Sequence, residues 1–392
     1  MIQNIRKISI LNKIFNVNGG QWSKISFSWT INFLYRAAFV ICWTMILTVF
    51  VGRFGISYLP HLFVINAFFT VLGSIFYSVF IDQFKKEHIL AVTVVIAIFI
   101  TAVANSFARE NVILFLALLL VVISVFLNQF KIISNGYSEE MFNPVESERA
   151  FPLIETSEVV GGIAAGIAIA VFSDIPIKDF IYLFVAILIA TIPCLILCEN
   201  ICKKELKIRK EKEFESKGIL SKFKKELSSA RHIKFIKGLF LIVLVQWILF
   251  NLLEFQYTKA IYQDISGLIL DSGSGFEHAF AHELGAMFVL FNVFALVVQI
   301  FLGSRFITSL GVIGSMLIHP IITFFSLFGL MFSFGFSSAV FAKNNFTITT
   351  TIYTNSYHSA YYAVKESLRE HTREFLEGIV RPIGAISGMI LL

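Results

Sequence analysis

Four charged residues lie inside long apolar segments, where an ionised side chain is costly and by default indicates function. They are Arg36, Glu254, Lys343 and Arg381. Three of the four are cations, so a cavity shared among them would hold an anionic substrate through charge-assisted hydrogen bonds. The alternative for each residue alone is a structural ion pair, or a long side chain whose charged end reaches the membrane surface.

Uncharged polar residues accompany these charges in the apolar segments. They are Asn66, Gln246, Asn251, Asn292, Gln299, Asn344, Asn345 and the threonines of the stretch 347–351. Such groups either line an aqueous pathway or form hydrogen bonds between membrane helices, and the sequence leaves both interpretations open. We place Asn345 and Glu254 with the three cations as candidate substrate-binding residues.

Two further patterns are weak indications of chemistry. Glu155 and Glu158 are carboxylates nearly one helical turn apart. Acidic residues at the start of a helix are, however, favoured by its dipole without any catalytic role. His278 and His282 have the i, i+4 spacing of metal ligands, but we expect them in an external loop without a third ligand.

The sequence contains no catalytic motif. It has no phosphate-binding P-loop, no GxSxG nucleophile elbow and no Cys–His nucleophile pattern. All four cysteines fall within or beside apolar segments, and Cys198 and Cys202 lie one helical turn apart. Free cysteines of this kind are more often small packing residues than metal ligands. We therefore expect no enzyme activity, no bound metal and no cofactor.

The elements that must position these residues are membrane helices. The sequence is 57% hydrophobic and 15% charged, whereas a typical soluble domain has about 25% charged residues. A spanning helix needs roughly 20 mostly apolar residues. The candidates cover residues 27–51, 59–81, 89–107, 112–130, 154–172, 180–197, 235–253, 285–301, 306–328, 332–353 and 375–392. The sequence thus predicts an all-α polytopic membrane protein with about eleven transmembrane helices.

A short pattern occurs twice and relates two parts of the chain. In each copy, an Arg-x-Phe triplet precedes an apolar helix with two glycines four residues apart. The residues are Arg149, Gly162 and Gly166 in the first copy and Arg373, Gly384 and Gly388 in the second. Glycines at this spacing let two membrane helices approach closely. We predict that these residues pack or gate equivalent helices, the fifth and the eleventh.

Basic residues divide the chain and indicate its orientation. The longest basic segment, at 198–234, separates a six-helix half at 27–197 from a second half at 235–392. Because Lys and Arg accumulate on the cytoplasmic side, we expect this connector and segment 1–26 to be cytoplasmic. The net charge of +6 then reflects topology and contact with anionic lipid headgroups rather than binding to nucleic acid.

Two halves of about six helices, related by a parallel repeat, are typical of the major facilitator superfamily. The loop after the second span resembles that superfamily's clamp between helix ends, with Asp82 and Lys86 as a charge pair that latches one conformation. The second half has one predicted helix fewer, since the eleventh span runs to Leu392. We therefore expect eleven of twelve helices and a truncated second half, in a fragment or in a protein with downstream domains.

Several strings resemble the ATP/ADP translocase family, the nucleotide transporters of intracellular bacteria and plastids together with their bacterial relatives. The strings are Arg53–Pro60, Tyr77–Asp82, Phe142–Gly166 and Lys343–Gly388, and the regions around Arg149 and Arg373 are the most specific. The resemblance implies exchange of ATP for ADP, or of another nucleotide, by alternating access in a bacterial cytoplasmic membrane. It also implies that Lys343 is similar to a basic residue that recognises nucleotides in the family's tenth helix. Arg36-Ala37-Ala38 stands where transporting members are rich in Arg, Lys and Asp.

We thus expect a secondary transporter that exchanges nucleotides or another organic anion held near Arg36, Lys343 and Arg381. One alternative is a transporter-like membrane sensor or scaffold whose regulatory module lies beyond the present sequence. Another is an ordinary proton-coupled facilitator in which Glu254 carries the proton. The expected partners are the lipid bilayer and an anionic small molecule, and the oligomeric state is left open.

Overall fold

Helices and short turns make up the described part of the chain, which contains no strand. The computed structural model describes residues 21–81, 84–142, 144–172, 174–209, 234–268, 274–361, 363–364 and 366–392. Asp82, residues 1–20 of the expected N-terminal segment and residues 210–233 of the expected connector lie outside the described residues. The prediction of an all-α membrane protein is confirmed.

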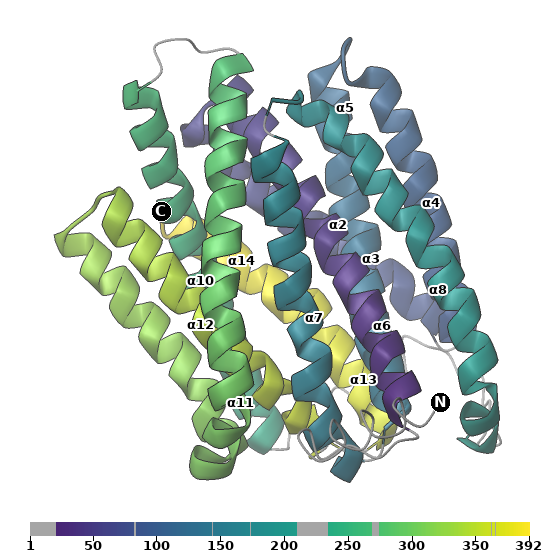
Figure 1. The fold of residues 1–392 in the computed structure, drawn as a ribbon. Coiled ribbons are helices and arrows are strands. Elements are labelled where there is room, and N and C mark those ends of the chain that lie inside the picture. The colour runs from purple at the N-terminus through teal and green to yellow at the C-terminus, as the bar shows by residue number, and fades with distance from the viewer. Residues whose placement is uncertain are drawn as a thin grey trace, which may run out of the picture.

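The first half is a bundle of long helices (Figure 1). They are α2 (Trp22–Phe54), α3 (Leu59–Ile81) after the short η2 (Ile56–Tyr58), α4 (Lys86–Phe107), the rod formed by α5 (Val112–Val121), η3 (Val122–Leu127) and α6 (Asn128–Glu140), α7 (Pro144–Val171), and α8 (Phe180–Arg209) after the short η4 (Ile177–Asp179). The first span begins earlier than predicted, because helix starts at Trp22 and residues 22–26 continue into α2.

The second half is also built of long helices, with some interruptions. Its elements are α10 (Lys234–Leu268), α11 (Ser274–Phe332), α12 (Phe336–Tyr361), α13 (Glu366–Phe375), η5 (Leu376–Val380) and α14 (Arg381–Ile390). The long α11 contains two of the predicted spans, 285–301 and 306–328, and its break at Gly311 falls near the start of the second span. The φ of Gly311, 71°, lies in a region that residues with side chains rarely adopt, which explains why a glycine stands at this turn.

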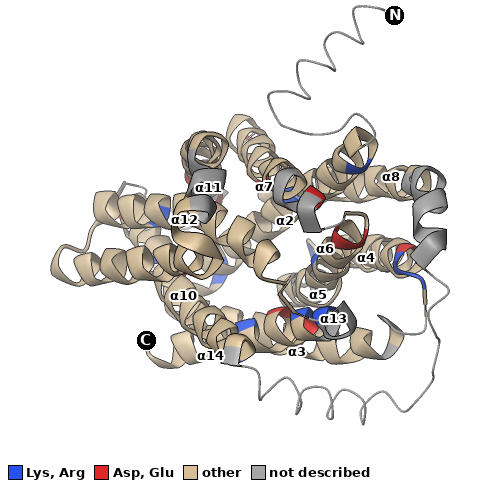
Figure 2. Ribbon diagram, turned by 90° about the horizontal axis from the view of Figure 1, so that it is seen from below, with Lys and Arg blue, Asp and Glu red and all other residues tan. Residues whose placement is uncertain are grey.

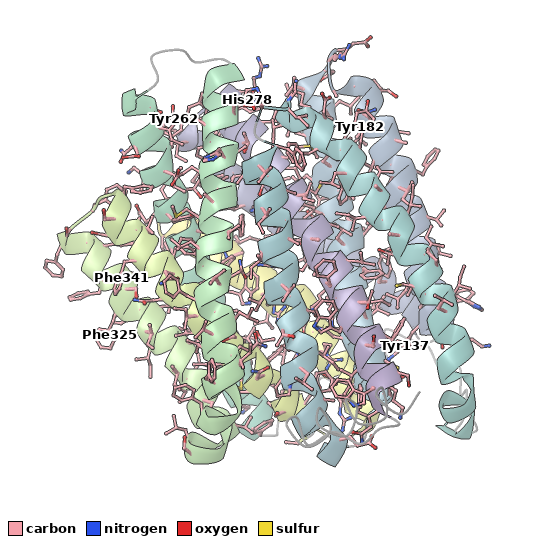
Figure 3. All side chains as sticks on the ribbon, viewed as in Figure 1. Tyr137, Tyr182, Tyr262, His278, Phe325 and Phe341 are labelled. Atoms are coloured by element: carbon pink, nitrogen blue, oxygen red, sulfur yellow. The ribbon has the colours of Figure 1, made fainter. Side chains whose placement is uncertain are left out.

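Nine helical segments in the described residues are long and apolar enough to cross a membrane. The remaining two predicted spans correspond to α12 and to the rod α13–η5–α14, which lie in the same bundle (Figure 1). On the outer surface, Phe325 and Phe341 are 63% and 66% exposed and point away from the bundle (Figure 3). An apolar outer surface of this kind suits lipid tails. We call the end at which α2 begins the lower end and the opposite end the upper end, as drawn in Figure 1.

Helix α2 lies at the centre of its half. Of its apolar stretch, 72% is buried inside the protein, whereas the other spans bury 28% to 50%. The reason is that α2 packs along α7 and α8 and also contacts α11 of the second half. Residues on α2 are therefore well placed to take part in a site between the halves.

The glycines of the first repeat copy lie where α7 crosses α11 of the other half. A Cβ atom at Gly166 would lie 2.8 Å from the carbonyl oxygen of Gly285, which is closer than real Cβ atoms come. A Cβ atom at Gly162 would lie 3.0 Å from the side-chain amide of Asn292. The absence of side chains at these positions allows the two backbones to approach.

The glycines of the second copy have a partner within their own half. A Cβ atom at Gly384 would lie 3.0 Å from the carbonyl oxygen of Leu244, and one at Gly388 would lie 2.8 Å from that of Ile248. Both carbonyl groups belong to α10. In both copies of the repeat, the glycines let another helix approach closely. That helix belongs to the other half in the first copy and to the same half in the second.

Candidate functional site

A lysine and a glutamate form an ion pair inside the second half. Lys343 of α12 contacts Glu254 of α10, and each residue is 9% exposed. The rings of Phe250, Tyr257 and Phe346 surround the ammonium group, with their centroids 5.0 to 5.7 Å from Nζ. A buried charge is tolerated in an apolar helix bundle only when an opposite charge compensates it. Glu254 supplies that charge, and the aromatic faces add cation–π attraction.

Asn345 does not share this environment. It follows Lys343 by two residues, and each residue of a helix turns by about 100°, so Asn345 projects from nearly the opposite side of α12. One turn further along its own face, Thr349 contacts His319 of α11 at 2.7 Å. The structure therefore brings Lys343 and Glu254 together but separates Asn345 from them.

Arg381 forms a second cationic centre at the start of α14. Its guanidinium group pairs with Glu377 at 3.3 Å, one helical turn earlier. The rings of Trp247 and Tyr357 lie 5.4 Å from its central carbon. The side chain is 25% exposed, and neither its Nε nor the buried hydroxyl of Tyr353 has a hydrogen-bond partner among the described residues. This centre therefore has donors free for a ligand.

Arg36 of α2 is half-buried, with its central carbon 6.0 Å from the ring of Phe39. In the described ranges, no carboxylate lies within ion-pair distance of Arg36. The adjacent Tyr35 is buried, and charges from both halves lie near its hydroxyl group, those of Glu158 and Arg36 from the first half and those of Arg381 and Glu377 from the second.

A third group of charges joins the two halves at the lower end. His358 of α12 lies 3.0 Å from Glu139 of α6 and 3.1 Å from Glu155 of α7. Arg373 of α13 also contacts Glu139, and its Nε lies 3.7 Å from Glu377 of η5. All five side chains are at most 4% exposed. Helices α6 and α13 are in contact, and the view from below shows acidic and basic residues gathered there (Figure 2).

The remaining gating candidates have separate positions. Lys86 pairs with Glu140 at 2.8 Å, a contact within the first half rather than between the halves. Asp82, its expected partner, lies outside the described residues, as does the side chain of Arg149, although the backbone of Arg149 belongs to α7. The latch predicted from Asp82 and Lys86 stays a prediction.

The paired carboxylates and the paired histidines have separate surroundings in the structure. Glu155 contacts His358, whereas Glu158 contacts Lys131, so the two carboxylates have different partners. His278 lies at the upper end (Figure 3), within α11. The prediction of a loop there is wrong because the helix already begins at Ser274. The described part of the chain contains no group of three or more His, Cys, Asp or Glu residues that suits a metal ion.

Sequence reasoning missed Glu139, His358 and Glu377. The first two lie at helix ends, where charged residues usually face water and therefore do not indicate a buried site. A signal for Glu377 was present, because Arg373, Glu377 and Arg381 follow one another at intervals of four and therefore share one helix face.

Comparisons with known proteins agree with this architecture. The family described as Major Facilitator Superfamily matches residues 23–391. Among solved structures, the nucleoside transporter NupG has a TM-score of 0.62 at 12% identity, with 94% of this chain and 89% of that chain covered. The human organic anion transporter MFSD10 has a TM-score of 0.61 at 10% identity, with 93% and 92% covered.

A bacterial homologue of the iron transporter ferroportin, in its outward-facing state, has a TM-score of 0.64 at 15% identity, with 94% and 90% covered. The comparison with curated proteins gave no match. Identities this low show a shared fold, and they do not support the narrower resemblance to ATP/ADP translocases. The match to the family over nearly the whole chain, together with the two-half bundle, shows that this protein belongs to the major facilitator superfamily and is a secondary transporter of that fold.

Proposed function

We propose that this transporter carries a small organic anion and that Lys343 is the cation that contacts it. The observation that carries the proposal is the buried contact between Lys343 and Glu254. A lysine held in the interior by a single carboxylate can exchange that partner for the carboxylate or phosphate of a substrate. The charge balance of the site is preserved if Glu254 takes up a proton as the anion arrives.

The energetic reason for this coupling is the cost of an uncompensated buried charge. If the anion paired with Lys343 while Glu254 stayed ionised, one negative charge would remain without a partner, at a cost of about 3–5 kcal/mol. Protonation of Glu254 removes that cost. Binding of the anion and binding of a proton should therefore be linked.

Arg36 and Arg381 support the same substrate class. Arg381 has an unpaired donor, and in the described residues Arg36 has no carboxylate partner. Guanidinium groups bind carboxylate and phosphate with two parallel hydrogen bonds. We propose that they contact the anion in the part of the transport cycle in which it leaves Lys343.

The aromatic residues around Lys343 favour an organic anion over an inorganic one. The faces of Phe250, Tyr257 and Phe346 form apolar walls at about the same distance from the ammonium group, and such faces stack well on planar groups. A nucleotide has both an anionic and a planar part, and the resemblance of the sequence makes ATP/ADP exchange the first case to test. NupG, MFSD10 and the ferroportin homologue differ widely in what they carry, and this range gives no preference for one anion.

We also propose that the lower end faces the cytoplasm. The support is the concentration of Lys and Arg before the first span and in the connector between the halves. In this orientation, α2 begins in the cytoplasm, and the anion reaches Lys343 from the upper, external end of α12.

Transport in proteoliposomes tests the proposal. Purified protein is reconstituted, and uptake of labelled organic anions is measured by counter-exchange, with ATP and ADP as the first pair and simple carboxylates after them. We expect Lys343→Ala to slow uptake roughly 10- to 150-fold, the effect of losing about 1.5–3 kcal/mol from a hydrogen bond to a charged group. We expect Glu254→Gln to retain exchange but to lose accumulation driven by a pH gradient.

Lys259→Ala is the matched control. Lys259 also lies on α10 and also has an aromatic neighbour, Phe334, at 5.6 Å, so its loss removes a comparable side chain outside the ion pair. This variant should transport like the parent protein. Uptake that is unchanged in Lys343→Ala for every transported anion would contradict the role of Lys343, and exchange of carboxylates without exchange of ATP and ADP would exclude nucleotides.

A further inference from the structure

His358 lies between two carboxylates that belong to the other half of the protein. Its Nδ1 is 3.0 Å from Glu139 Oε1 and its Nε2 is 3.1 Å from Glu155 Oε1. The Nδ1 contact has the geometry of a hydrogen bond, whereas the Nε2 contact is at ion-pair distance only, and Glu155 Oε1 has no hydrogen-bond partner among the described residues. An ionised carboxylate on each side of the ring favours the protonated, positively charged imidazole.

The charged groups around His358 favour the same protonated form. They are Glu139 of α6, Glu155 of α7, Glu377 of η5, Arg373 of α13 and Arg381 of α14. The carboxylates outnumber the guanidinium groups, and the buried Glu374 of α13 adds to this excess of negative charge. A protonated imidazole offsets part of the excess, whereas a neutral one would leave all of it uncompensated, which is unfavourable.

Two other charged residues approach this cluster. Lys131 of α6 acts on Glu155 through its charge, but it is paired with Glu158. Glu374 of α13 lies 3.1 Å from the side-chain amide of Gln129, which donates to it when its nitrogen faces the carboxylate. On α12 itself, the hydroxyl of Tyr361 lies 3.4 Å from Glu377.

The contacts of His358 with Glu139 and Glu155 can exist only while the two halves meet at the lower end, as they do in this structure. His358 belongs to the second half, and both of its carboxylate partners belong to the first. The ring also stacks on Phe151 of α7, with centroids 5.0 Å apart. When the halves separate at this end, the imidazole must leave both carboxylates and enter water, where an imidazole loses its proton near about pH 6.5.

We propose that His358, with Glu139 and Glu155, forms a proton-binding site that is filled when the lower end closes and emptied when it opens. The site makes the closed lower end more stable at low pH and less stable at high pH. The proposal goes beyond the proposed transport of an anion, because it concerns access to the substrate site and does not depend on which substrate is carried.

Linkage sets the size of the expected effect. If closing takes up one proton, the ratio of open to closed protein rises by at most tenfold for each unit of pH. The rise is confined to the range above the pH at which the solvated imidazole titrates, about 6.5. Below that range both states hold the proton, and the ratio should not change with pH.

Spin-label distances measure this ratio without any substrate. Cysteines replace His88 and Ser309 in a protein whose four native cysteines have been removed. His88 is an exposed residue at the start of α4, and Ser309 is an exposed residue beside the break in α11. The distance between labels at these positions increases when the halves separate at the lower end. We expect the fraction with the longer distance to increase as the pH is raised from 5 to 9 in lipid nanodiscs.

Variants identify the proton-binding group. His358→Gln should give a distance distribution that is independent of pH, and Glu155→Gln should move the transition to lower pH because one acceptor of the charged imidazole is lost. His282→Gln, which removes an exposed histidine of α11 near the upper end, is the matched control and should keep the full response. If His358→Gln does not fold, the shift in Glu155→Gln decides the question.

Three results would overturn the proposal. The first is a distance distribution in the parent protein that does not change between pH 5 and 9. The second is a pH response that persists in His358→Gln, and the third is an unshifted transition in Glu155→Gln. A protein that transports no anion but shows the pH response would refute the proposed function alone, and transport without the response would refute this inference alone.

Discussion

Two of the buried ion clusters in the described residues differ in how they relate to the halves of the protein. Lys343 and Glu254 both belong to the second half, on α12 and α10. The cluster of Arg373, Glu139 and His358 connects the second half to the first. In a facilitator fold, alternating access moves the halves largely as rigid bodies. A pair within one half can persist through the cycle and respond to a ligand, whereas a cluster between halves must break and re-form in each cycle.

Loss of one member of the Lys343–Glu254 pair should have the largest effect on stability. Lys343→Ala leaves Glu254 as an uncompensated buried charge, so we expect a loss of about 3–5 kcal/mol in the free energy of unfolding. Adding Glu254→Ala should recover much of that loss. Denaturant unfolding in detergent measures both. If the losses in the free energy of unfolding of the two single variants add up to that of the double variant, the two charges do not interact.

Glu139→Gln should affect the distribution between open and closed states more than stability. Glu139 is bound by both His358 and Arg373, and each hydrogen bond to a charged group contributes about 1.5–3 kcal/mol. We expect the ratio of open to closed protein at the lower end, measured with the same spin labels, to increase by roughly 10- to 100-fold or more.

Glu158→Gln is the matched control for that experiment, because Glu158 pairs with Lys131 inside the first half. It should leave the distances at the lower end unchanged. Equal responses of the two variants would contradict the distinction between clusters within a half and clusters between halves.

The repeated glycines allow the same distinction to be tested by packing. Gly166 lies against α11 of the other half and Gly388 against α10 of its own half. Overpacking of a close contact costs about 1–3 kcal/mol. We expect Gly166→Val to change the spin-label distances between the halves, and Gly388→Val to lower the unfolding temperature without changing them.

Lys86→Ala should have the smallest effect. Its partner Glu140 is 40% exposed and lies in the same half, and exposed ion pairs contribute about 0–1 kcal/mol. We expect transport and spin-label distances like those of the parent protein. A large increase in the open fraction would show that Lys86 is a latch after all, as predicted from the loop after the second span.

The sequence predicted the spans and their grouping better than the contacts of the site. Eleven apolar segments and a duplicated Arg-x-Phe and glycine pattern are local features, and local features can be read from a chain. Arg36, Glu254, Lys343 and Arg381 were also recognisable, because charges are rare inside apolar helices, and Arg373 was recognisable from the repeat. Which charges pair with one another was not predictable, since helical periodicity indicates which residues share a face of one helix but not which other helix packs against that face.

By itself, the sequence determined that this protein is a membrane bundle of helices in two related halves, because hydropathy and spacing are properties of short stretches of chain. Only the tertiary structure decided that Lys343 meets Glu254 across 89 residues, that His358 meets Glu139 across 219, and that Arg373 meets the same carboxylate across 234. It also gave the two glycine pairs different neighbours. The physical reason is that packing of whole helices, rather than any local preference, determines which buried charges compensate one another.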